Sequence, residues 1–165
     1  MEGPADVDVR CSAAVFRDGG VLLVHHARDG GAGYWVLPGG APQAGEGMAA
    51  CAQRETLEET GMSVAPGRVA FVLEALAPGS RRRVVDLVFL AAITVRGEPK
   101  VHEEDAEARF VPVNVLPGLV LRPALAGHLR ALHDRGPTRT AAYLGNMWRP
   151  EAGATGGSPG PPAAP

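Results

Sequence analysis

The sequence predicts a single α/β domain with a mixed β-sheet, and three observations favour this fold class. Apolar runs typical of strands alternate irregularly with two segments of helical pattern, residues 47–60 and 119–134. Asp18-Gly19 stands between two apolar runs, which is a strong signal for a hairpin and therefore for antiparallel neighbours. A chain of 165 residues with 45% hydrophobic side chains can bury one substantial core.

The charge balance and the apolar runs disfavour several classes of partner. The net charge is −2 and the isoelectric point about 6.2, so no overall basic field attracts the chain to nucleic acid or to anionic membranes. No apolar run approaches the roughly 20 residues of a membrane-spanning helix. The N-terminal residues are acidic and lack the apolar core of a signal peptide. We therefore expect a cytoplasmic protein with no nucleic-acid partner and no membrane partner.

The N-terminal part is predicted to be a hairpin behind a loose leader. Residues 1–7 are expected to be loose, and the folded domain is expected over residues 8–135. Two strands, Val9–Phe16 and Val21–His26, flank the Asp-Gly turn. The Gly-rich loop Arg28–Gly33 follows them.

A short strand over residues 34–38 leads into Gly39-Gly40. Pro38 ends the strand pairing because it has no N–H, and the two glycines let the backbone approach a metal ion or a phosphate closely. Trp35 is expected to anchor the core, and stacking on a nucleobase is its alternative role.

The chain is organised around the next stretch, which ends at Met62. The run from residue 47 to residue 60 has no proline and is rich in Ala, Gln, Glu and Met, which predicts a helix terminated by Gly61. At about 100° per residue, one face of this helix carries three carboxylates. These are Glu55, Glu58 and Glu59, and the inward face is expected to consist of Ala49, Ala52 and Thr56.

The three carboxylates destabilise the helix electrostatically at these positions. They repel one another and oppose the helix dipole, because they lie at the C-terminal end. Hard divalent cations such as Mg²⁺ or Mn²⁺ would remove that cost, since they prefer carboxylate oxygens. Arg54 can hold a neighbouring carboxylate through two hydrogen bonds. A solvated acidic face is the alternative, but the glycines, Glu46 and Arg54 stand at fixed offsets and favour a metal site.

At these residues the chain resembles the Nudix hydrolase family. The family signature is G-x5-E-x7-R-E-U-x-E-E-x-G-U, where U is an aliphatic residue. The departure is Thr56 at the first U position, a β-branched residue that can still pack inward. The signature is specific, and the resemblance covers roughly residues 8–135. The matching residues are Gly40, Glu46, Arg54, Glu55, Glu58, Glu59, Gly61 and Met62.

Beyond the helix, the pattern predicts three more strands and a closing helix. Pro123 is expected in the first turn of that helix, residues 119–134, and Leu125, Leu129 and Leu132 give it an apolar stripe. The predicted strands are Val69–Ala75, Val84–Val95, which only Asp86 interrupts, and Ala108–Val113.

The remaining features concern the C-terminus and the two cysteines. Residues 136–149 are ambiguous, since they are too apolar for a pure linker and are expected to pack on the domain or on a partner. Residues 150–165 are rich in Pro, Gly and Ala and are expected to be disordered. Cys11 and Cys51 are expected to be buried free thiols, and a bridge between them stays open.

The resemblance implies an α/β/α sandwich and a metal-dependent hydrolase, with Mg²⁺ or Mn²⁺ as cofactor. The implied reaction is cleavage of a pyrophosphate bond in a nucleoside diphosphate linked to another group. Glu55 and Glu59 are the first choices as metal ligands, with Glu58 next and the Gly39 carbonyl as a further ligand. Glu46 is expected to bind a water on the ion or to hold a second ion, and Arg54 to orient Glu55 or Glu58. The general base is Glu58, Glu59 or a glutamate of the loop that carries Glu103, Glu104 and Glu107.

The substrate itself is left open by the sequence. Arg28, Trp35 and Arg81 are the candidate substrate contacts. An ADP-ribose-type compound, a nucleoside triphosphate-type compound and an isoprenoid diphosphate all fit, and the resemblance also implies that a homodimer is possible. The alternative function is a catalytically silent nucleotide-binding domain that regulates a partner, although the presence of every signature glutamate favours an enzyme.

Overall fold

The computed structural model describes residues 3–28, 30–100 and 106–150. Over these residues the chain forms two α-helices, one short 3₁₀ helix and eight strands. The helices are α1 (Met48–Thr60), η1 (Leu116–Gly118) and α2 (Ala126–Arg135). The strands are β1 (Asp6–Arg17), β2 (Gly20–Arg28), β3 (Gly31–Val36), β4 (Gly39–Gly40), β5 (Val64–Ala75), β6 (Arg82–Ile93), β7 (Ala106–Pro112) and β8 (Ala142–Asn146).

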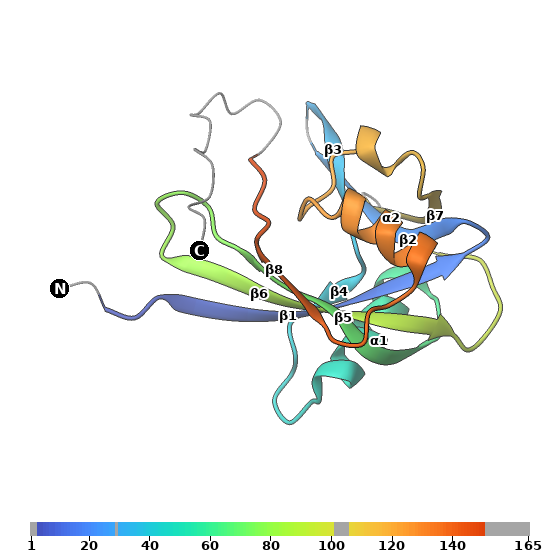
Figure 1. Cartoon of the computed structure of the whole chain (residues 1–165), viewed down its shortest axis with the longest axis horizontal. Coiled ribbons are helices and arrows are strands. Elements are labelled where there is room, and N and C mark those ends of the chain that lie inside the picture. Colours follow the sequence, from blue (N-terminus) through green and yellow to red (C-terminus); the bar gives the residue numbers. More distant parts are fainter. Residues whose placement is uncertain (1–2, 29, 101–105, 151–165) are drawn as a thin grey trace.

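The strands form one mixed sheet, as the sequence predicts. Its order is β3-β2-β1-β6-β5-β8, with β4 paired to β1 and β7 paired to β2 (Figure 1). Strand β1 runs parallel to β6 and β5 runs parallel to β8, while the other pairs are antiparallel. The long β1–β6 pair lies at the centre of this order, so it fixes the positions of both helices.

Alternate residues of β1 face opposite helices, which makes the molecule an α/β/α sandwich. Cys11 packs in a buried cluster with Cys51 and Ala52 of α1. Ala14 packs in the main core with Leu129 of α2. Because side chains of a strand alternate between the two faces of a sheet, Arg10, Ser12 and Ala14 share the α2 face. The two helices accordingly lie on opposite sides of the sheet in Figure 1.

The first hairpin forms where it is expected. Phe16 pairs with Val21 and Arg17 with Gly20, so Asp18 and Gly19 make a two-residue turn. Both turn residues have positive φ, 49° and 77°, which is the backbone of the turn that Asp-Gly favours. The expected leader is partly wrong, because β1 begins at Asp6, where it pairs with Arg82 of β6.

The other strands lie where expected with shifted ends. Strand β5 begins at Val64 rather than Val69, and β7 begins at Ala106 rather than Ala108. Strand β6 is displaced toward its N-terminal side and spans Arg82–Ile93.

The closing helix begins later than predicted. It starts at Ala126, so Pro123 precedes it and does not occupy its first turn. The preceding segment is bonded to β3 instead: the Trp35 N–H donates to the Val120 carbonyl and the Arg122 N–H to the Trp35 carbonyl. These bonds hold the segment extended. The predicted apolar stripe is confirmed, because Leu125, Leu129 and Leu132 are all buried.

The ambiguous C-terminal segment packs on the domain. Strand β8 runs along β5 in parallel, and the Met147 N–H donates to the Glu74 carbonyl at 2.8 Å. Of the tail that is expected to be disordered, residues 151–165 lie outside the described residues.

Two sequence expectations concern thiols and membranes. Cys11 and Cys51 are free and buried, as expected. Neither α1 nor α2 is long and apolar enough to cross a membrane, and the same holds for every helix in the described part of the chain.

We expect Leu129→Ala to lower the free energy of unfolding by about 2–5 kcal/mol, because Leu129 is fully buried between α2 and the sheet. Denaturant unfolding measures this. Val95→Ala, at a side chain that is 62% exposed, is the matched control and should change stability by no more than about 0.5 kcal/mol. Equal effects of the two substitutions would contradict the packing described for α2.

Candidate active site

Helix α1 carries the predicted cluster, and both of its ends are set by glycine. Gly47 precedes it, and Gly61 ends it in the left-handed conformation, with φ 68° and its N–H bonded to the Leu57 carbonyl. The buried face differs in part from the expectation. Ala49 is exposed, and the stripe runs instead through Cys51, Ala52, Thr56 and Thr60.

The signature's one departure, Thr56, is accommodated inside the helix. Its side chain is fully buried, and its hydroxyl donates to the Ala52 carbonyl at 2.7 Å. Thr60 repeats this arrangement one turn later, donating to the Thr56 carbonyl at 2.6 Å. The hydroxyls are therefore satisfied by the helix itself, and threonine packs where the family has an aliphatic residue.

The guanidinium of Arg54 holds three carboxylates at once. It donates to both oxygens of Glu46, from Nε at 2.7 Å and from Nη2 at 2.9 Å. Its Nη1 donates to Glu55 at 2.6 Å and to Glu58 at 3.0 Å. A rigid fork of this kind fixes the orientation of the groups it binds. The glutamates of α1 are thus tied to the loop that precedes the helix.

These contacts keep Glu46 and Arg54 ionised. The Arg54 guanidinium and the Gln43 backbone N–H together lower the pKa of Glu46 from 4.5 to about 2. The hydrogen bonds to Glu46 and Glu55 raise the pKa of Arg54 above its ordinary value. The charges of Glu46 and Arg54 therefore persist throughout the neutral range.

Strand β4 requires glycine at both of its positions. A Cβ at Gly40 would stand 2.5 Å from Glu55 Oε1, and one at Gly39 would stand 2.6 Å from Ser12 Oγ. Gly39 also donates its N–H to Glu59 Oε2 at 2.9 Å. The glycines therefore let the backbone lie directly against the carboxylates of α1.

The donor chemistry fits a hard divalent cation. Glu55 and Glu59 present carboxylate oxygens beside β4, and Arg54 binds Glu58 next to Glu55. No three acidic, histidine or cysteine side chains of the described residues are grouped to hold an ion by themselves. Mg²⁺ is usually held by one or two carboxylates together with waters and substrate phosphates, so a complete protein cage is not required. Glu55 and Glu59 would hold such an ion, and ligation by the Gly39 carbonyl stays a prediction.

The predicted substrate contacts do not gather at this cluster. Trp35 is only 7% exposed and contacts the His25 ring and the Arg109 guanidinium, so it belongs to the core as expected, and stacking on a base stays a prediction. Arg28 is exposed at the tip of the β2–β3 hairpin. Arg81 is exposed just before β6, six strand positions or about 20 Å from the β1 residue that pairs with Gly40.

The predicted base loop is described only in part. Glu103 and Glu104 lie outside the described residues. Glu107 is exposed on β7 and is paired with Arg109 at 3.4 Å. The Lys100 N–H donates to the Thr60 carbonyl at 2.8 Å, so the chain passes the C-terminal end of α1 shortly before this loop.

A buried polar network on the opposite face of β1 was not predicted as part of a site. Ser12 donates to both oxygens of Asp86, at 2.8 and 2.9 Å, and Arg10 Nε lies 3.6 Å from the same carboxylate. Arg10 Nη2 donates to the Leu37 carbonyl at 2.8 Å. The network therefore connects the central strands to the chain that enters β4. Its sequence signal was Asp86, the one charged residue inside an apolar strand.

Burial governs the titration of Asp86. The side chain is 3% exposed, and desolvation raises its pKa from 3.8 to about 6, although Arg10 and Ser12 oppose that shift.

This network lies at a cavity of about 320 Å³. Arg10 and Asp86 line it together with Val36 of β3 and with Trp148, which follows β8. Residues of the sheet and of the C-terminal segment therefore both line the cavity.

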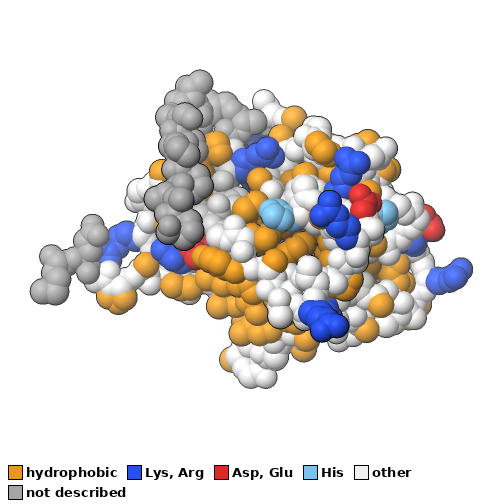
Figure 2. All heavy atoms as spheres, in the orientation of Figure 1, with side chains coloured by type: hydrophobic (Ala, Val, Ile, Leu, Met, Phe, Trp, Pro, Cys, Tyr) orange, Lys and Arg blue, Asp and Glu red, His pale blue; other side chains and the backbone are white. Residues whose placement is uncertain are grey.

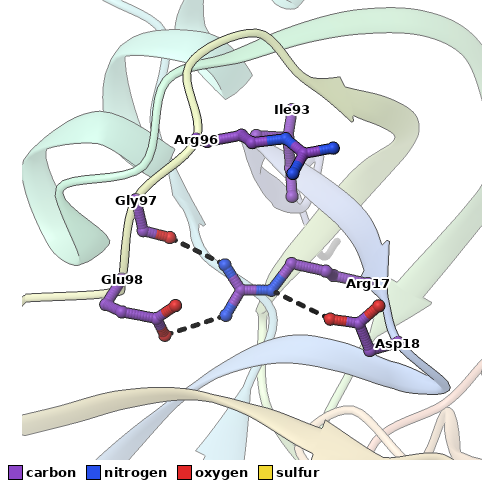
Figure 3. A pocket seen from close by; sticks show the side chains of 6 residues that line it. All are labelled: Arg17, Asp18, Ile93, Arg96, Gly97 and Glu98. Atoms are coloured by element: carbon purple, nitrogen blue, oxygen red, sulfur yellow. Dashed lines mark hydrogen bonds and ion pairs between the residues drawn. The ribbon is translucent and has the colours of Figure 1, made fainter.

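A larger hollow, of about 500 Å³, lies at the other end of β1 (Figure 3). Its central cation is Arg17, which donates to the Gly97 carbonyl at 2.7 Å and to Glu98 at 2.9 Å. The same guanidinium lies over the Phe110 ring. Because these contacts occupy Arg17, we do not assign the hollow to the active site.

Comparison with known proteins agrees with the signature. The model of the NUDIX domain matches residues 8–134. The ADP-ribose pyrophosphatase of Methanocaldococcus jannaschii is 29% identical over 111 residues, which are 67% of this chain and 65% of that relative. The match therefore spans less than two thirds of the relative's length.

Solved structures of NUDIX hydrolases are also similar to this chain. A MutT NUDIX hydrolase from Burkholderia pseudomallei is 32% identical with a TM-score of 0.55, over 66% of this chain and 85% of that chain. A NUDIX hydrolase from Nitrosomonas europaea has a TM-score of 0.67 at 20% identity, over 82% of this chain and 91% of that chain, and shows the likeness of fold alone.

The raised pKa of Asp86 predicts how stability depends on pH. Between pH 3.8 and about 6 the folded state binds the proton more tightly than the unfolded state, so the free energy of unfolding falls as the pH rises through this window. That difference in pKa corresponds to about 3 kcal/mol. Asp86→Asn removes the titration while its amide oxygen still accepts from Ser12. We expect the variant to be at least as stable as the wild type at pH 7.5.

Thermal unfolding of both proteins from pH 3.5 to 7.5 measures this. Asp134→Asn is the control of opposite sign, because the neighbouring His133 lowers the pKa of that exposed carboxyl. An Asp86→Asn protein less stable than the wild type at pH 7.5 would show that the attraction to Arg10 outweighs the desolvation.

Proposed function

The chain belongs to the NUDIX hydrolase family, and on that premise we propose that it is a divalent-metal-dependent hydrolase of a pyrophosphate bond. The substrate class we propose is a nucleoside diphosphate linked to another group. The observation that carries this proposal is the cluster of Glu55, Glu58 and Glu59, ordered by Arg54 and by the Gly39 N–H beside two obligatory glycines.

The carboxylates of α1 are proposed to have different roles in the reaction. A divalent cation, when bound, screens the phosphate charge and makes water more acidic. Glu55 and Glu59 are the proposed ligands, since both are held against β4. Glu58 has a side chain that is 55% exposed, so it is open to solvent water as a base or as a third ligand. The base is proposed to be Glu58, Glu59 or a glutamate among Glu103, Glu104 and Glu107.

Arg54 and Glu46 act as positioning residues in this proposal. Glu46 is bound through both oxygens, which supports a role in fixing the guanidinium rather than in binding an ion directly. Arg54 in turn fixes Glu55 and Glu58. The two glycines of β4 contribute to this positioning, because the backbone at Gly40 lies against the Glu55 carboxylate and the backbone at Gly39 lies against Ser12.

Several finer points belong to the same proposal. The name of the Methanocaldococcus jannaschii relative supports an ADP-ribose-type substrate, and the MutT name of the Burkholderia pseudomallei structure supports a triphosphate-type substrate. We propose Mg²⁺ or Mn²⁺ as the ion, a small nucleotide and no nucleic acid as the partner, and a cytoplasmic location. A homodimer stays a prediction.

A substrate panel tests the proposal. Purified protein is incubated with ADP-ribose, nucleoside triphosphates, a dinucleoside polyphosphate, a nucleotide sugar and an isoprenoid diphosphate, with Mg²⁺, with Mn²⁺ or with EDTA. Metal-dependent cleavage of one nucleotide, read by chromatography, supports the hydrolase. Absence of turnover together with thermal stabilisation by one nucleotide would favour the silent regulatory domain.

We expect Glu59→Gln to lower turnover by at least about 100-fold, which corresponds to about 2.7 kcal/mol of transition-state stabilisation. Removing one of the crowded carboxylates relieves repulsion, so the melting temperature should hold or rise. Steady-state kinetics and thermal unfolding measure the two effects. Glu98→Gln, at a side chain that is 80% exposed, is the control and should keep wild-type turnover. Near-normal turnover of Glu59→Gln would remove Glu59 from the metal site.

Gly40→Ala should disable the site through geometry alone. The added Cβ would stand 2.5 Å from Glu55 Oε1 and displace that carboxylate, so we expect a loss of turnover of about 10- to 100-fold. Gly47→Ala is the matched control, because nothing lies within 4 Å of a Cβ there. Steady-state kinetics of the two variants measure this difference in turnover. Unchanged turnover of Gly40→Ala would show that the position of Glu55 does not limit the reaction.

A further inference from the structure

The 320 Å³ cavity has an aromatic side chain at its wall that no motif of the family explains. Trp148 lines the cavity and is 38% exposed. It follows β8, beyond residue 134, where the match to the family domain ends. Ligand pockets are lined mainly by apolar and aromatic side chains with a few polar groups, and an aromatic ring at the wall of this cavity fits that composition.

The backbone around Trp148 is held on two sides. The Met147 N–H donates to the Glu74 carbonyl at 2.8 Å, and the Ala124 N–H donates to the Met147 carbonyl at 3.3 Å. The Trp148 N–H donates to Asn146 Oδ1 at 3.1 Å. The ring is therefore presented to the cavity by bonded chain, which lowers the entropic cost of binding a ligand against it.

The side chains that line the 320 Å³ cavity indicate which kind of ligand group it can bind. Arg10, Arg122 and Arg149 contribute three guanidinium groups, against the single carboxylate of Asp86. Apolar walls complete the cavity, from Val36, Leu73, Val84 and Pro123. On the face of the molecule that carries α2, Lys and Arg side chains are also more prominent than Asp and Glu (Figure 2). The cavity thus combines flat apolar contacts with hydrogen-bond donors.

A nucleobase satisfies these features better than the other groups considered. Its π face stacks on tryptophan, and its ring nitrogens and carbonyls accept from guanidinium groups. An isoprenoid tail offers no hydrogen-bond acceptor to the guanidinium groups that line the cavity. A sugar phosphate without a base has no π face to lay on Trp148.

The cavity lies next to the hydrolytic cluster along the chain. Val36 lines it, Arg10 binds the Leu37 carbonyl, and two residues later Gly39 binds Glu59. Two residues span at most about 7 Å. Phosphates attached to a group in the cavity would therefore have only a short distance to span to reach Gly39-Gly40.

We propose that Trp148 stacks on the nucleobase of the substrate, so that a segment outside the family domain supplies a specificity-determining residue. This inference rests on the proposed function, since it names where the nucleoside half of that substrate binds. It also assigns a role to the C-terminal extension, which presents the ring.

Kinetics of Trp148 variants test the proposal. With the nucleotide that the wild type cleaves, we expect Trp148→Ala to raise KM by about 10-fold or more, from lost stacking, and to change kcat by no more than about twofold. Trp148→Phe should restore much of the KM and guards against misfolding of the alanine variant. Tyr143→Ala removes an exposed aromatic of β8 that does not line the cavity, and should keep the wild-type KM. An unchanged KM in Trp148→Ala would overturn the proposal while the hydrolase function stands.

A binding measurement separates this proposal from the proposed function. Tryptophan fluorescence of Glu59→Gln is titrated with AMP, with GMP and with ribose 5-phosphate, which lacks a base. We expect AMP and GMP to quench the tryptophan fluorescence and ribose 5-phosphate to leave it unchanged. We expect this quenching to disappear in Glu59→Gln/Trp148→Phe, in which Trp35 is the remaining tryptophan. A base-dependent quench without turnover by the wild type would refute the hydrolase and support the pocket. Equal quenching in both proteins would refute the role of Trp148.

Discussion

The charge of Arg54 is the constraint on which the cluster of Glu55, Glu58 and Glu59 depends. Three glutamates on one helix face, at the end where the helix dipole disfavours them, are unstable without a cation. The guanidinium supplies that cation within the protein, and through Glu46 it fixes the helix to the preceding loop. The carboxylates are therefore ordered before an ion or a substrate arrives, which is the preorganisation that electrostatic catalysis requires.

The central strand pair determines where the two parts of the site lie. Because side chains alternate along β1, Cys11 packs against α1 while Arg10 and Ser12 belong to the opposite face. Strand β4 pairs with β1 at Cys11 and Ser12, so its glycines lie at the border between the two faces. A diphosphate that crosses the border at Gly39-Gly40 can present one end to the glutamates and the other to the cavity.

The sequence predicted those parts that depend on local spacing. Helix α1, its Gly61 terminus and the Asp18-Gly19 turn each follow from residues a few positions apart, and all three are confirmed. The start of α2 was wrong, because pairing of the preceding segment with β3 overrode its helical pattern. Trp148 was missed for the same reason. Its place at the same cavity as Asp86 depends on the pairing of β8 with β5, a contact between distant segments that no local pattern records.

The division between the two faces also explains why the signature leaves the substrate open. The residues proposed to hold an ion and a diphosphate lie within residues 39–62 and would serve any compound with that linkage. The residues of the cavity come from β1, β3, β6 and the segment after β8, and no short motif contains them. Substitution in the cavity can therefore change which group is bound without disturbing Arg54 or its glutamates. A C-terminal extension that presents its own tryptophan gives this chain a route to a preference that the family domain alone does not encode.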